Sequence, residues 1–583
     1  MPSEEQPHWA EHAFRDLDPV RVLYEDDDLI VVDKPAGVPS QAPDATRPHD
    51  LPSRLKSFLA TRRGTTPDQV YLGTHQRLDR DSSGVILYTL RESANASIAA
   101  QFESRTVTKR YLAAVSGNPP ARGTQLTHWL APDRDGRMRI LRAKAPNAKQ
   151  AKSTIEEVRR EGDRSLVRVR IDTGRTHQIR VQLAAQGCAL AGDTLYEGSP
   201  AFRLMLHSES LTFDHPVTGL TIEIRAPVPP ELEDWLHHGP RAAFLEPALF
   251  RSALEHACQR RFSEGRALAA GITTTFRLLH EEADAVPGFG VDVYDRYLVV
   301  RERADVSRGD EELFLAGLAP LAVAGVYLKR HPKQANELMQ AEDDRAAPSA
   351  PVLGTAAPET LIVHENGVPY GVQLHAGLRT GLFLDQRDNR RRIAELASGK
   401  RVLNLFAYTG SFSVAALAAG AAHVTTVDVS KTALRWADRN VERIGGSERH
   451  RSIAQDAFDA LERLASRGER FDVIVCDPPS YATTKRGRFR VTKDYVALCR
   501  AALQVIAPEG VVLACLNHYG ISQVSLRKFV QTAVQAQGLL LSALRDTPAQ
   551  VDFPVAGGAE APTKSVLAWV RSNSLLQRQP GRV

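Results

Sequence analysis

Apolar and polar residues alternate along short segments in the first third of the chain. Residues 165–174, SLVRVRIDTG, alternate apolar and basic side chains with a period of two, which is typical of a half-buried strand. Residues 28–40, DLIVVDKPAGVPS, begin with an apolar run that a Lys-Pro-Ala-Gly turn ends. Residues 211–227 place Pro-Val-Thr-Gly between two strand patterns, as in a hairpin. The first part is therefore predicted to be rich in strands.

Proline clusters interrupt this pattern at two places. Residues 226–247 predict a domain edge near residue 240, and residues 341–360 predict a second linker. Between them lie a basic helix pattern over 248–271 and a strand pair over 288–304. We therefore predict a small middle α+β domain. The predicted domains are 1–240, 241–345 and 346–583.

The rhythm changes again from about residue 398, where strand and helix patterns alternate. The apolar segment 401–410, RVLNLFAYTG, is followed by a helix pattern rich in small residues. Further strand patterns follow at 423–430, 471–480 and 510–517, with the helix pattern 431–445 after the first of them. Strands that alternate with helices indicate a doubly wound parallel sheet, so a Rossmann-like C-terminal domain is predicted. The whole is a multidomain α/β protein.

Composition adds few constraints. A length of 583 residues exceeds the usual size of one hydrophobic core, so several domains are expected. The net charge of +5 permits nucleic acid as a partner without requiring it. The five cysteines are scattered and lack C-x-x-C spacing, which argues against a disulfide framework or structural zinc. With no signal-peptide pattern and no apolar run of membrane-spanning length, a cytoplasmic location without membrane contact is expected.

Polar residues end the predicted strands of the C-terminal domain, where ligands bind in open α/β sheets. Gly410 ends the first strand, and Asp428 ends the next, where a carboxylate can hold ribose hydroxyls. Asp456 ends a third segment, and a stiff DPPSY loop, residues 477–481, ends the fourth. Because the first turn has a single glycine, a nucleoside-type ligand is favoured over a dinucleotide.

These segments, with RTGLFLDQRDNR (379–390) and VCDPPSYATTKRGRFRVTKDY (475–495), resemble the class I S-adenosylmethionine-dependent methyltransferases. In detail they are similar to the large-subunit ribosomal RNA methyltransferases, over about residues 245–575. The resemblance implies S-adenosylmethionine as cofactor, with Asp477 at the catalytic centre. The cofactor-binding residues that it implies are Asp385, Gln386, Arg387, Tyr408, Gly410, Asp428, Asp456 and Asp477. The residues that it places against the target base are Pro478, Pro479, Tyr481 and Asn517.

The methylated atom depends on whether a cysteine is available. Carbon 5 of cytosine reacts only after a thiolate adds to the ring. The cytosine enzymes of this family carry the cysteine in the turn that ends the strand after the DPP loop, which here is the strand predicted over 510–517. Here Cys515 falls two residues early, inside the predicted strand, and the turn carries Asn517 and His518. Guanine N7 already has a lone pair, so positioning can suffice. Guanine is therefore favoured, while its exocyclic amine and cytosine C5 stay open.

The N-terminal part carries a second set of motifs. THQRLDRDSSG (74–84) precedes a strand pattern, TKRYLAAVSG (108–117) contains Tyr111, and IDTGRTHQIR (171–180) follows another strand pattern. In order and spacing these resemble the RluA-type pseudouridine synthases, over about residues 18–232. The resemblance implies that Asp79 is catalytic, that Arg180 pairs with it, and that Tyr111 contacts the base or transfers a proton. Arg77 would fill the space that the flipped uridine leaves.

One position departs from this second family, which usually has His-Arg-Leu-Asp where this chain has Gln76 before Arg77. Pseudouridine formation needs a carboxylate, which acts either as nucleophile or as base, and neither cofactor nor metal. The two resemblances together predict a bifunctional enzyme that isomerises uridine and methylates a base of RNA, with 23S ribosomal RNA as the expected partner. In the alternative, one module is an inactive RNA-binding relic. The sequence leaves the oligomeric state open.

Overall fold

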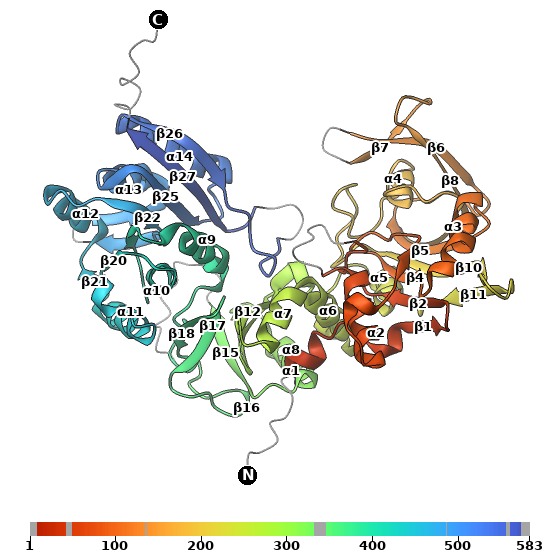
Figure 1. Ribbon diagram of the computed structural model, residues 1–583, viewed down its shortest axis with the longest axis horizontal. Helices are drawn as coiled ribbons and strands as arrows, with labels where there is room; N and C mark the ends of the chain where they lie inside the picture. The colour runs from red at the N-terminus through yellow and green to blue at the C-terminus, as the bar shows by residue number, and fades with distance from the viewer. Residues whose placement is uncertain are drawn as a thin grey trace, which may run out of the picture. The chain divides into compact units, whose positions relative to one another are not determined.

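The computed structural model divides into two compact units (Figure 1). It describes the whole chain except residues 1–8, 42–48, 134–136, 332–345, 485–486, 556–559 and 573–583. The N-terminal unit comprises Met1–Arg266, Leu278–Phe289 and Asp305–Ala322; the C-terminal unit comprises Ala267–Arg277, Gly290–Ala304 and Val323–Val583. The expected division at 240 and 345 stays a prediction, and its second boundary lies outside the described residues.

The described strands of the N-terminal unit form one mixed sheet in the order β1-β2-β4-β10-β5-β9-β8-β6-β7, with β11 beside β10 and β3 beside β4. Strands β4 and β10 pair in parallel, whereas β10 and β11 form the antiparallel hairpin expected from the Pro-Val-Thr-Gly turn. The bounds are β1 Val22–Glu25, β2 Leu29–Lys34, β3 Gly73–Thr74, β4 Ser83–Thr89, β5 Thr108–Ser116, β6 Gln125–Pro132, β7 Met138–Leu141, β8 Lys149–Glu161, β9 Arg164–Ile171, β10 Leu206–Asp214 and β11 Thr221–Arg225.

Helices complete this unit, and one of them forms where proline accumulates. Helix α5 starts at Pro230 and buries Leu232 and Trp235 against the sheet, together with Leu112 and Leu166 of β5 and β9. The single helix expected over 248–271 forms instead as α6 and α7 on either side of Arg261. The helices are α1 Trp9–Ala13, α2 Leu51–Arg63, α3 Asn95–Ser104, α4 Gln178–Ala184, α5 Pro230–His238, α6 Pro247–Arg260, α7 Phe262–Ala269 and α8 Arg308–Leu318.

A smaller sheet, most of which belongs to the C-terminal unit, has the order β12-β13-β14-β15-β16. Strands β13 and β14 are the pair predicted over 288–304, and β14 runs parallel to β15. A hairpin of β17 and β18 follows. The bounds are β12 Thr275–His280, β13 Phe289–Tyr294, β14 Tyr297–Arg303, β15 Gly325–His331, β16 Leu353–Gly354, β17 Leu361–Glu365 and β18 Val368–Val372.

The large sheet of the C-terminal unit confirms the doubly wound prediction. Its order is β21-β20-β19-β22-β25-β27-β26, parallel from β21 to β25 and antiparallel at β27 and β26. The direction of winding reverses between β19 and β22, and ligands bind at such a switch point in open α/β sheets. The bounds are β19 Arg401–Leu405, β20 His423–Asp428, β21 His450–Ala454, β22 Phe471–Cys476, β25 Ile506–Asn517, β26 Leu539–Asp546 and β27 Thr563–Ser572.

Helices pack on both faces of this sheet, where buried side chains gather in two clusters (Figure 1). A short hairpin, β23 Tyr481–Thr484 and β24 Gly487–Arg490, follows the DPP loop. The helices are α9 Arg387–Ala397, α10 Ser411–Ala418, α11 Lys431–Arg443, α12 Ala457–Ser466, α13 Val491–Leu503 and α14 Gln523–Ala536. Among the helices that the structure describes, none is both long and apolar enough to cross a membrane.

Candidate functional sites

A cleft of about 1110 Å³ opens in the N-terminal unit, and all four residues predicted for its site line it: Arg77, Asp79, Tyr111 and Arg180. They come from separate elements, because Tyr111 lies on β5, Arg180 on α4 and the other two on the loop before β4. The mixed sheet therefore brings together residues that lie up to a hundred positions apart in the chain.

Arg180 links two carboxylates at the base of this cleft. Its Nη1 donates to Asp79 Oδ2 at 3.0 Å, while Nε and Nη2 donate to the two oxygens of Asp193 at 2.6 and 2.8 Å. The Asp193 side chain is fully buried, and Asp79 keeps 27% of its side-chain surface exposed. Burial alone would lower the pKa of Arg180, but the two carboxylates raise it above its ordinary value. Arg180 therefore stays charged and holds Asp79 in one orientation.

Asp193 is the residue of this site that sequence reasoning missed. It lies in a loop after Leu190, where an isolated aspartate has the pattern of an ordinary turn residue. Its Oδ1 also accepts backbone N–H bonds from Leu195 and Tyr196, so the loop itself holds the carboxylate that orients Arg180. The order in which charged residues follow one another gives no signal for such a contact.

The loop that carries Asp79 is held from beneath by the Lys-Pro-Ala-Gly turn after β2. Lys34 is fully buried, and its Nζ donates to the carbonyl oxygens of Pro35, Val38 and Arg80 at 3.0, 2.7 and 2.9 Å. Burial lowers the pKa of Lys34 to about 7. The Ser40 hydroxyl donates to the carbonyl of Leu78 at 2.8 Å and accepts from its N–H. These contacts fix the backbone on both sides of Asp79.

Tyr111 and the residues around Arg77 complete the cleft. Burial raises the pKa of Tyr111 to about 12, and nearby Asp79 adds to the effect, so the phenol stays protonated at neutral pH. Arg77 is exposed and, within the described part of the chain, forms no ion pair. Gln76, the departure from the family pattern, and His75 both line the cleft, and His75 Nε2 lies 3.2 Å from the hydroxyl of Thr89.

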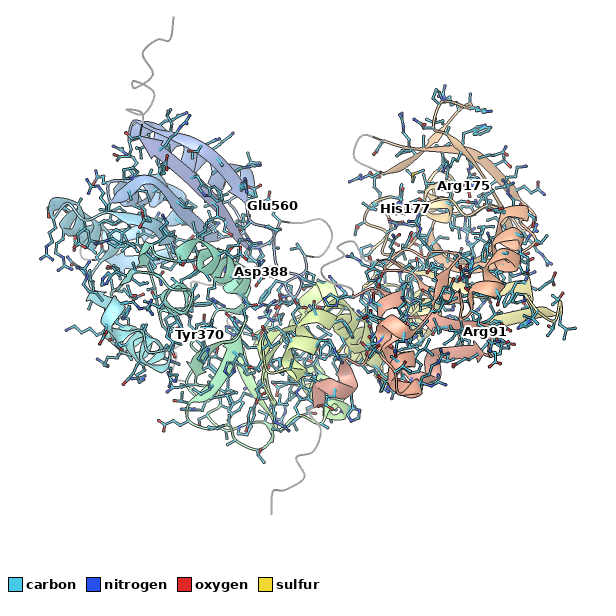
Figure 2. All side chains as sticks on the ribbon, viewed as in Figure 1. Arg91, Arg175, His177, Tyr370, Asp388 and Glu560 are labelled. Atoms are coloured by element: carbon cyan, nitrogen blue, oxygen red, sulfur yellow. The ribbon has the colours of Figure 1, made fainter. Side chains whose placement is uncertain are left out.

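His177 lies at the start of α4, and Arg175 precedes it on the same loop (Figure 2). The imidazole Nδ1 is 3.0 Å from the hydroxyl of Tyr196, and the backbone is left-handed with φ 52°. Burial lowers the pKa of His177, so the ring favours its neutral form. His177 is therefore held by Tyr196 at the edge of the loop that precedes α4.

The second site lies at the carboxyl ends of β19, β20 and β22. The backbone N–H groups of Tyr408 and Ser430 donate to the two oxygens of Asp428, both at 2.8 Å. Gly410 has φ 73°, and a Cβ there would lie 2.6 Å from the Cβ of Ala437. Glycine is therefore required at this turn, which lets the backbone of the loop approach a ligand closely. Asp428 ties the two strand-end loops together and keeps lone pairs for further donors.

Asp477 follows β22 and is held by a chain of amides. Gln386 Nε2 donates to Asp477 Oδ2 at 3.0 Å, and Asn389 Nδ2 in turn donates to the side-chain oxygen Oε1 of Gln386 at 2.7 Å. Burial, together with the negative charge of Asp385, raises the pKa of Asp477 to about 7. Asp385 itself accepts from the hydroxyl of Thr563 at 2.6 Å. Two carboxylates therefore lie near each other at the switch point, where a cationic ligand would stabilise both.

Two of the residues expected to bind the cofactor form hydrogen bonds within the protein. Both Nη atoms of Arg387 donate to the carboxylate of Asp552 at 2.9 Å, and this ion pair is buried. Asp456 is the N-cap of α12 and accepts from the N–H of Phe458 at 2.9 Å. The Arg387 guanidinium is thus used within the protein. For both residues, contact with the cofactor stays a prediction.

The residues expected to face the target base cluster after the DPP loop. Pro478 and Pro479 lead into Ser480, whose hydroxyl donates to the carbonyl of Asn517 and so joins the loop to the end of β25. Tyr481 is 49% exposed, and its ring centroid lies 6.5 Å from that of His518. An exposed aromatic ring and an amide therefore border the same end of the sheet, as stacking and pairing with a base require.

Cys515 lies inside β25 and is fully buried. Burial raises the pKa of its thiol well above the ordinary value, and the negative charge of Asp477 adds to the effect. The thiol donates a long hydrogen bond to Gln386 Oε1, with 4.0 Å between the two atoms. All five cysteines of the chain lie among the described residues, and all five are buried. At neutral pH the buried Cys515 thiol therefore favours its protonated form.

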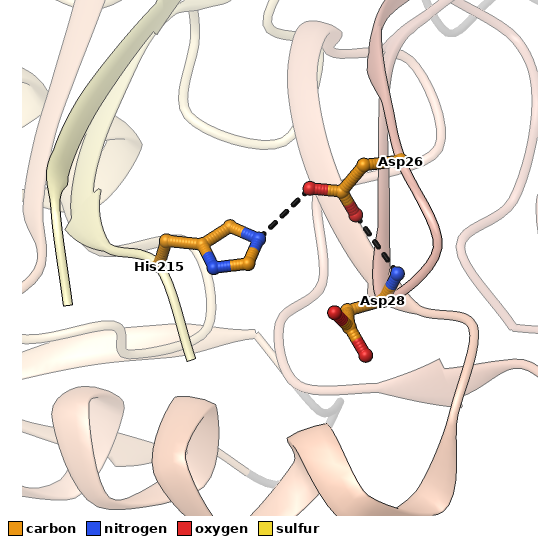
Figure 3. A group of neighbouring side chains, drawn as sticks. All are labelled: Asp26, Asp28 and His215. Carbon is orange, nitrogen blue, oxygen red and sulfur yellow. Dashed lines mark hydrogen bonds and ion pairs between the residues drawn. The ribbon is translucent and has the colours of Figure 1, made fainter. Parts of the chain in front are cut away.

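One carboxylate–imidazole group in the described chain has the spacing of a metal site: Asp26, Asp28 and His215 (Figure 3). The side chains of Asp26 and His215 already have hydrogen-bond partners, and Asp28 Oδ1 lies 3.7 Å from Arg91 Nη1. His215 Nε2 lies 2.8 Å from Asp26 Oδ2, and Nδ1 accepts from two backbone N–H groups of its own turn. Asp26 also accepts from the hydroxyl of Tyr24 at 2.6 Å. Through these contacts the group joins two turns of the sheet.

Comparisons with known proteins agree with both geometries. A model of S-adenosylmethionine-dependent methyltransferases matches residues 330–563, and a model of RNA pseudouridylate synthases matches residues 28–185. Ribosomal RNA large subunit methyltransferase I of Aeromonas salmonicida is 32% identical over 48% of this chain and 72% of its own. The ribosomal RNA large subunit methyltransferase of Deinococcus radiodurans is 32% identical over 50% and 72%. The solved structure of SMU.776 complexed with SAH, 24% identical with a TM-score of 0.50 over 61% of this chain and 87% of that one, shares the fold.

Proposed function

Because this chain belongs to the ribosomal RNA large subunit methyltransferases and also contains an RNA pseudouridylate synthase domain, we propose that it modifies a uridine and a guanine of 23S ribosomal RNA. The observation that carries this proposal is that each unit holds its own buried or half-buried reacting carboxylate. Asp79 is fixed by Arg180 in one unit, and Asp477 by Gln386 in the other. A cytoplasmic location stays a prediction.

In the isomerisation, the C1′–N1 bond of uridine breaks, the base rotates, and C5 bonds to C1′. C5 loses a proton and N1 gains one, so no co-reactant is needed. Asp79 acts as nucleophile on the sugar or as base at C2′, and the geometry is compatible with both. Arg180 keeps the carboxylate ionised and aimed into the cleft. Tyr111 stays protonated and packs against the base, while Arg77 fills the space that the base leaves in the RNA stack.

In the methyl transfer, bound S-adenosylmethionine supplies a methyl group on a sulfonium. The residues at the switch point fit this cofactor: Gly410 lets the backbone approach, Asp428 has lone pairs for the ribose hydroxyls, and Asp477 and Asp385 provide negative charge beside a cation. The DPP loop presents carbonyl groups and the ring of Tyr481 to the base. This chain's contribution is to orient a nucleophilic base nitrogen and to exclude water.

Guanine is proposed as the methylated base because its nitrogens are nucleophilic without covalent activation. Cytosine C5 would require a thiolate, and Cys515 is buried with a raised pKa. The turn after β25 instead presents Asn517, which can donate to and accept from a guanine edge. N7 and the exocyclic amine are both compatible with this arrangement.

Mass-spectrometric mapping of 23S ribosomal RNA tests the proposal. RNA from cells that lack the gene is expected to lose one pseudouridine and one methylguanine, and both are expected to return when the full chain is supplied. Loss of a 5-methylcytosine instead would overturn the choice of base. Loss of a modification from transfer RNA alone would overturn the choice of RNA.

A further inference from the structure

One face of the smaller sheet in the C-terminal unit collects cationic side chains. Strands β14 and β15 pair in parallel, with Arg301 opposite Lys329 and Arg303 opposite His331. Side chains two positions apart share a face of a strand, so Arg301, Lys329 and His331 lie on the same side. On β12, Arg277 is bound by Asp292 of β13, with 3.1 Å between Nη2 and Oδ2.

Lys329 and His331 have no counter-charge within this cluster. Lys329 is fully buried, and among the described residues its Nζ lacks a hydrogen-bond partner; the ring centroid of Tyr327 lies 6.0 Å from it. Nε2 of His331 is likewise buried without a partner. Burial lowers the pKa of His331 to about 3, and the positive charges of Arg301, Arg277, Arg379 and Lys329 act in the same direction. An unpaired buried ammonium is costly, which calls for a compensating function.

Acidic residues do not balance the other cations. The carboxylate of Asp292 is bound by Arg277, and Arg301 Nη1 reaches it only at 3.9 Å while 44% of the Arg301 side chain is exposed. Arg379, also exposed, forms no ion pair within the described residues and lies over the ring of Phe383 at 5.5 Å. Among the described residues, Arg301 and Arg379 are therefore exposed cations without a hydrogen-bonded carboxylate partner.

This cluster adjoins the methyl-transfer site. The ring of Phe383 lies 5.3 Å from that of Tyr408, whose N–H binds Asp428. The charge of Arg379 also acts on Tyr408, and the charge of Asp385 acts on Arg301. A nucleotide positioned at the switch point would therefore carry its neighbouring phosphates toward these cations.

We propose that Arg301, Lys329, His331 and Arg379 form a binding site for a backbone phosphate of the RNA beside the methylated nucleotide. The inference rests on the proposed function, because it requires RNA to be the methyl acceptor. A phosphate would pair with the exposed guanidinium groups of Arg301 and Arg379, while the buried ammonium of Lys329 adds positive charge beside Arg301. Such contacts position the strand without reading its sequence.

Substitutions that remove a positive charge but keep the size of the side chain test the site. In the full chain, Lys329→Met and Arg301→Gln are compared with wild type for binding to a 23S transcript by fluorescence anisotropy at several salt concentrations. Each lost phosphate contact should reduce the slope of log Kd against log salt by about 0.7–0.9, and the double variant should bind about 10-fold more weakly at low salt. The KM for RNA should rise while kcat stays within about twofold.

The matched control is Arg391→Gln, a partly exposed arginine of α9 whose guanidinium is paired with Glu395 at 2.7 Å. It should leave the salt dependence unchanged. Lys329→Met should also keep or raise the melting temperature, because an unpaired buried charge is removed; a merely structural lysine would give a loss. Arg301 is exposed, so Arg301→Gln still tests phosphate binding if Lys329→Met fails to fold.

Three results would overturn the site. Unchanged salt slopes in Arg301→Gln and in the double variant would show that no phosphate binds there. A loss of S-adenosylmethionine affinity by calorimetry, with RNA binding intact, would assign the cations to the cofactor's carboxylate. A drop in the melting temperature of Lys329→Met, with unchanged RNA binding, would make the lysine structural. If wild-type protein binds the transcript but does not methylate it, the proposed function fails, and the salt slopes still decide the site.

Discussion

At the scale of single residues, both sites depend on partners that fix a carboxylate. Asp79 receives one hydrogen bond from Arg180, and Arg180 is itself oriented by the bidentate contact with Asp193. Asp477 is held by Gln386, which Asn389 orients. Asp193 thus orients Arg180, and Asn389 orients Gln386. Replacing Asp193 or Asn389 should therefore impair the reaction, although neither residue contacts the reacting nucleotide.

Asp193→Asn is expected to slow isomerisation at least about tenfold while methyl transfer is kept. The change leaves the buried Arg180 guanidinium with Asp79 as its remaining carboxylate, so the free energy of unfolding of the N-terminal unit should fall by about 3 kcal/mol. Tritium release from labelled uridine RNA and urea unfolding measure the two effects. Asp172→Asn, which removes an exposed carboxylate 3.5 Å from Arg170, is the control and should cost at most about 1 kcal/mol. Full isomerisation activity in Asp193→Asn would contradict the positioning role.

Asp477 should make cofactor binding depend on pH. Its pKa is raised to about 7, chiefly by burial, so the carboxyl group is largely protonated below that pH and becomes a carboxylate above it. A sulfonium cation favours the carboxylate, so S-adenosylmethionine should bind several-fold more tightly as the pH rises from about 6 to 8. Calorimetry across this range measures the change.

Two controls separate this effect from others. S-adenosylhomocysteine lacks the sulfonium charge and should show a weaker pH dependence, and Asp477→Asn should flatten the curve for S-adenosylmethionine. An equally steep curve in the Asp477→Asn variant would assign the titration to another group.

At the scale of elements, the residues proposed for methyl transfer lie at or just after the ends of strands. The register of β25 keeps Cys515 inside the sheet, opposite Ser565 of β27, whereas Asn517 is the exposed last residue of the strand. The loops after β19, β20 and β22 likewise bring Gly410, Asp428 and Asp477 to one edge because parallel strands end on the same side. In the other unit, α4 directs Arg180 at a loop that the turn after β2 supports.

Cys515→Ala should leave methyl transfer within about threefold of wild type, because a buried neutral thiol takes no part in the reaction. Asn517→Ala should reduce it at least about tenfold, because it removes the side chain that we propose contacts the base at the end of the strand. Methyl incorporation into the 23S transcript from labelled cofactor measures both. Loss of activity in Cys515→Ala, with a normal melting temperature, would instead support cytosine as the target.

At the scale of the whole molecule, two sites share one chain, and each lies within its own compact unit. The residues proposed for each reaction lie within one unit: Asp79, Tyr111 and Arg180 in the first, and Gly410, Asp428 and Asp477 in the second. The two reactions should therefore be separable by single substitutions.

Asp79→Asn should abolish pseudouridine formation, by at least about 100-fold, and leave methyl transfer unchanged. Asp428→Ala should do the reverse, because it removes the carboxylate that ties the two cofactor loops together. The same RNA preparation is assayed for both modifications. If either substitution removed both modifications while the protein stayed folded, the sites would not be independent.

The local pattern of the sequence was sufficient to predict many strands, the fold of the C-terminal unit and both enzyme classes. Period-two alternation identified β9, the strand–helix rhythm identified the doubly wound sheet, and the motifs identified both enzyme classes, because these features are set by neighbouring residues. Features that depend on packing between distant segments could not be predicted from the sequence. Four features depend on contacts between segments that are distant in the sequence. They are the pairing of Asp193 with Arg180, the contacts of Lys34 and Ser40 with the loop of Asp79, the packing of helix α5, and the cations around Lys329. Only the tertiary structure decides which buried charges find partners, since burial and partner distance are properties of the folded chain.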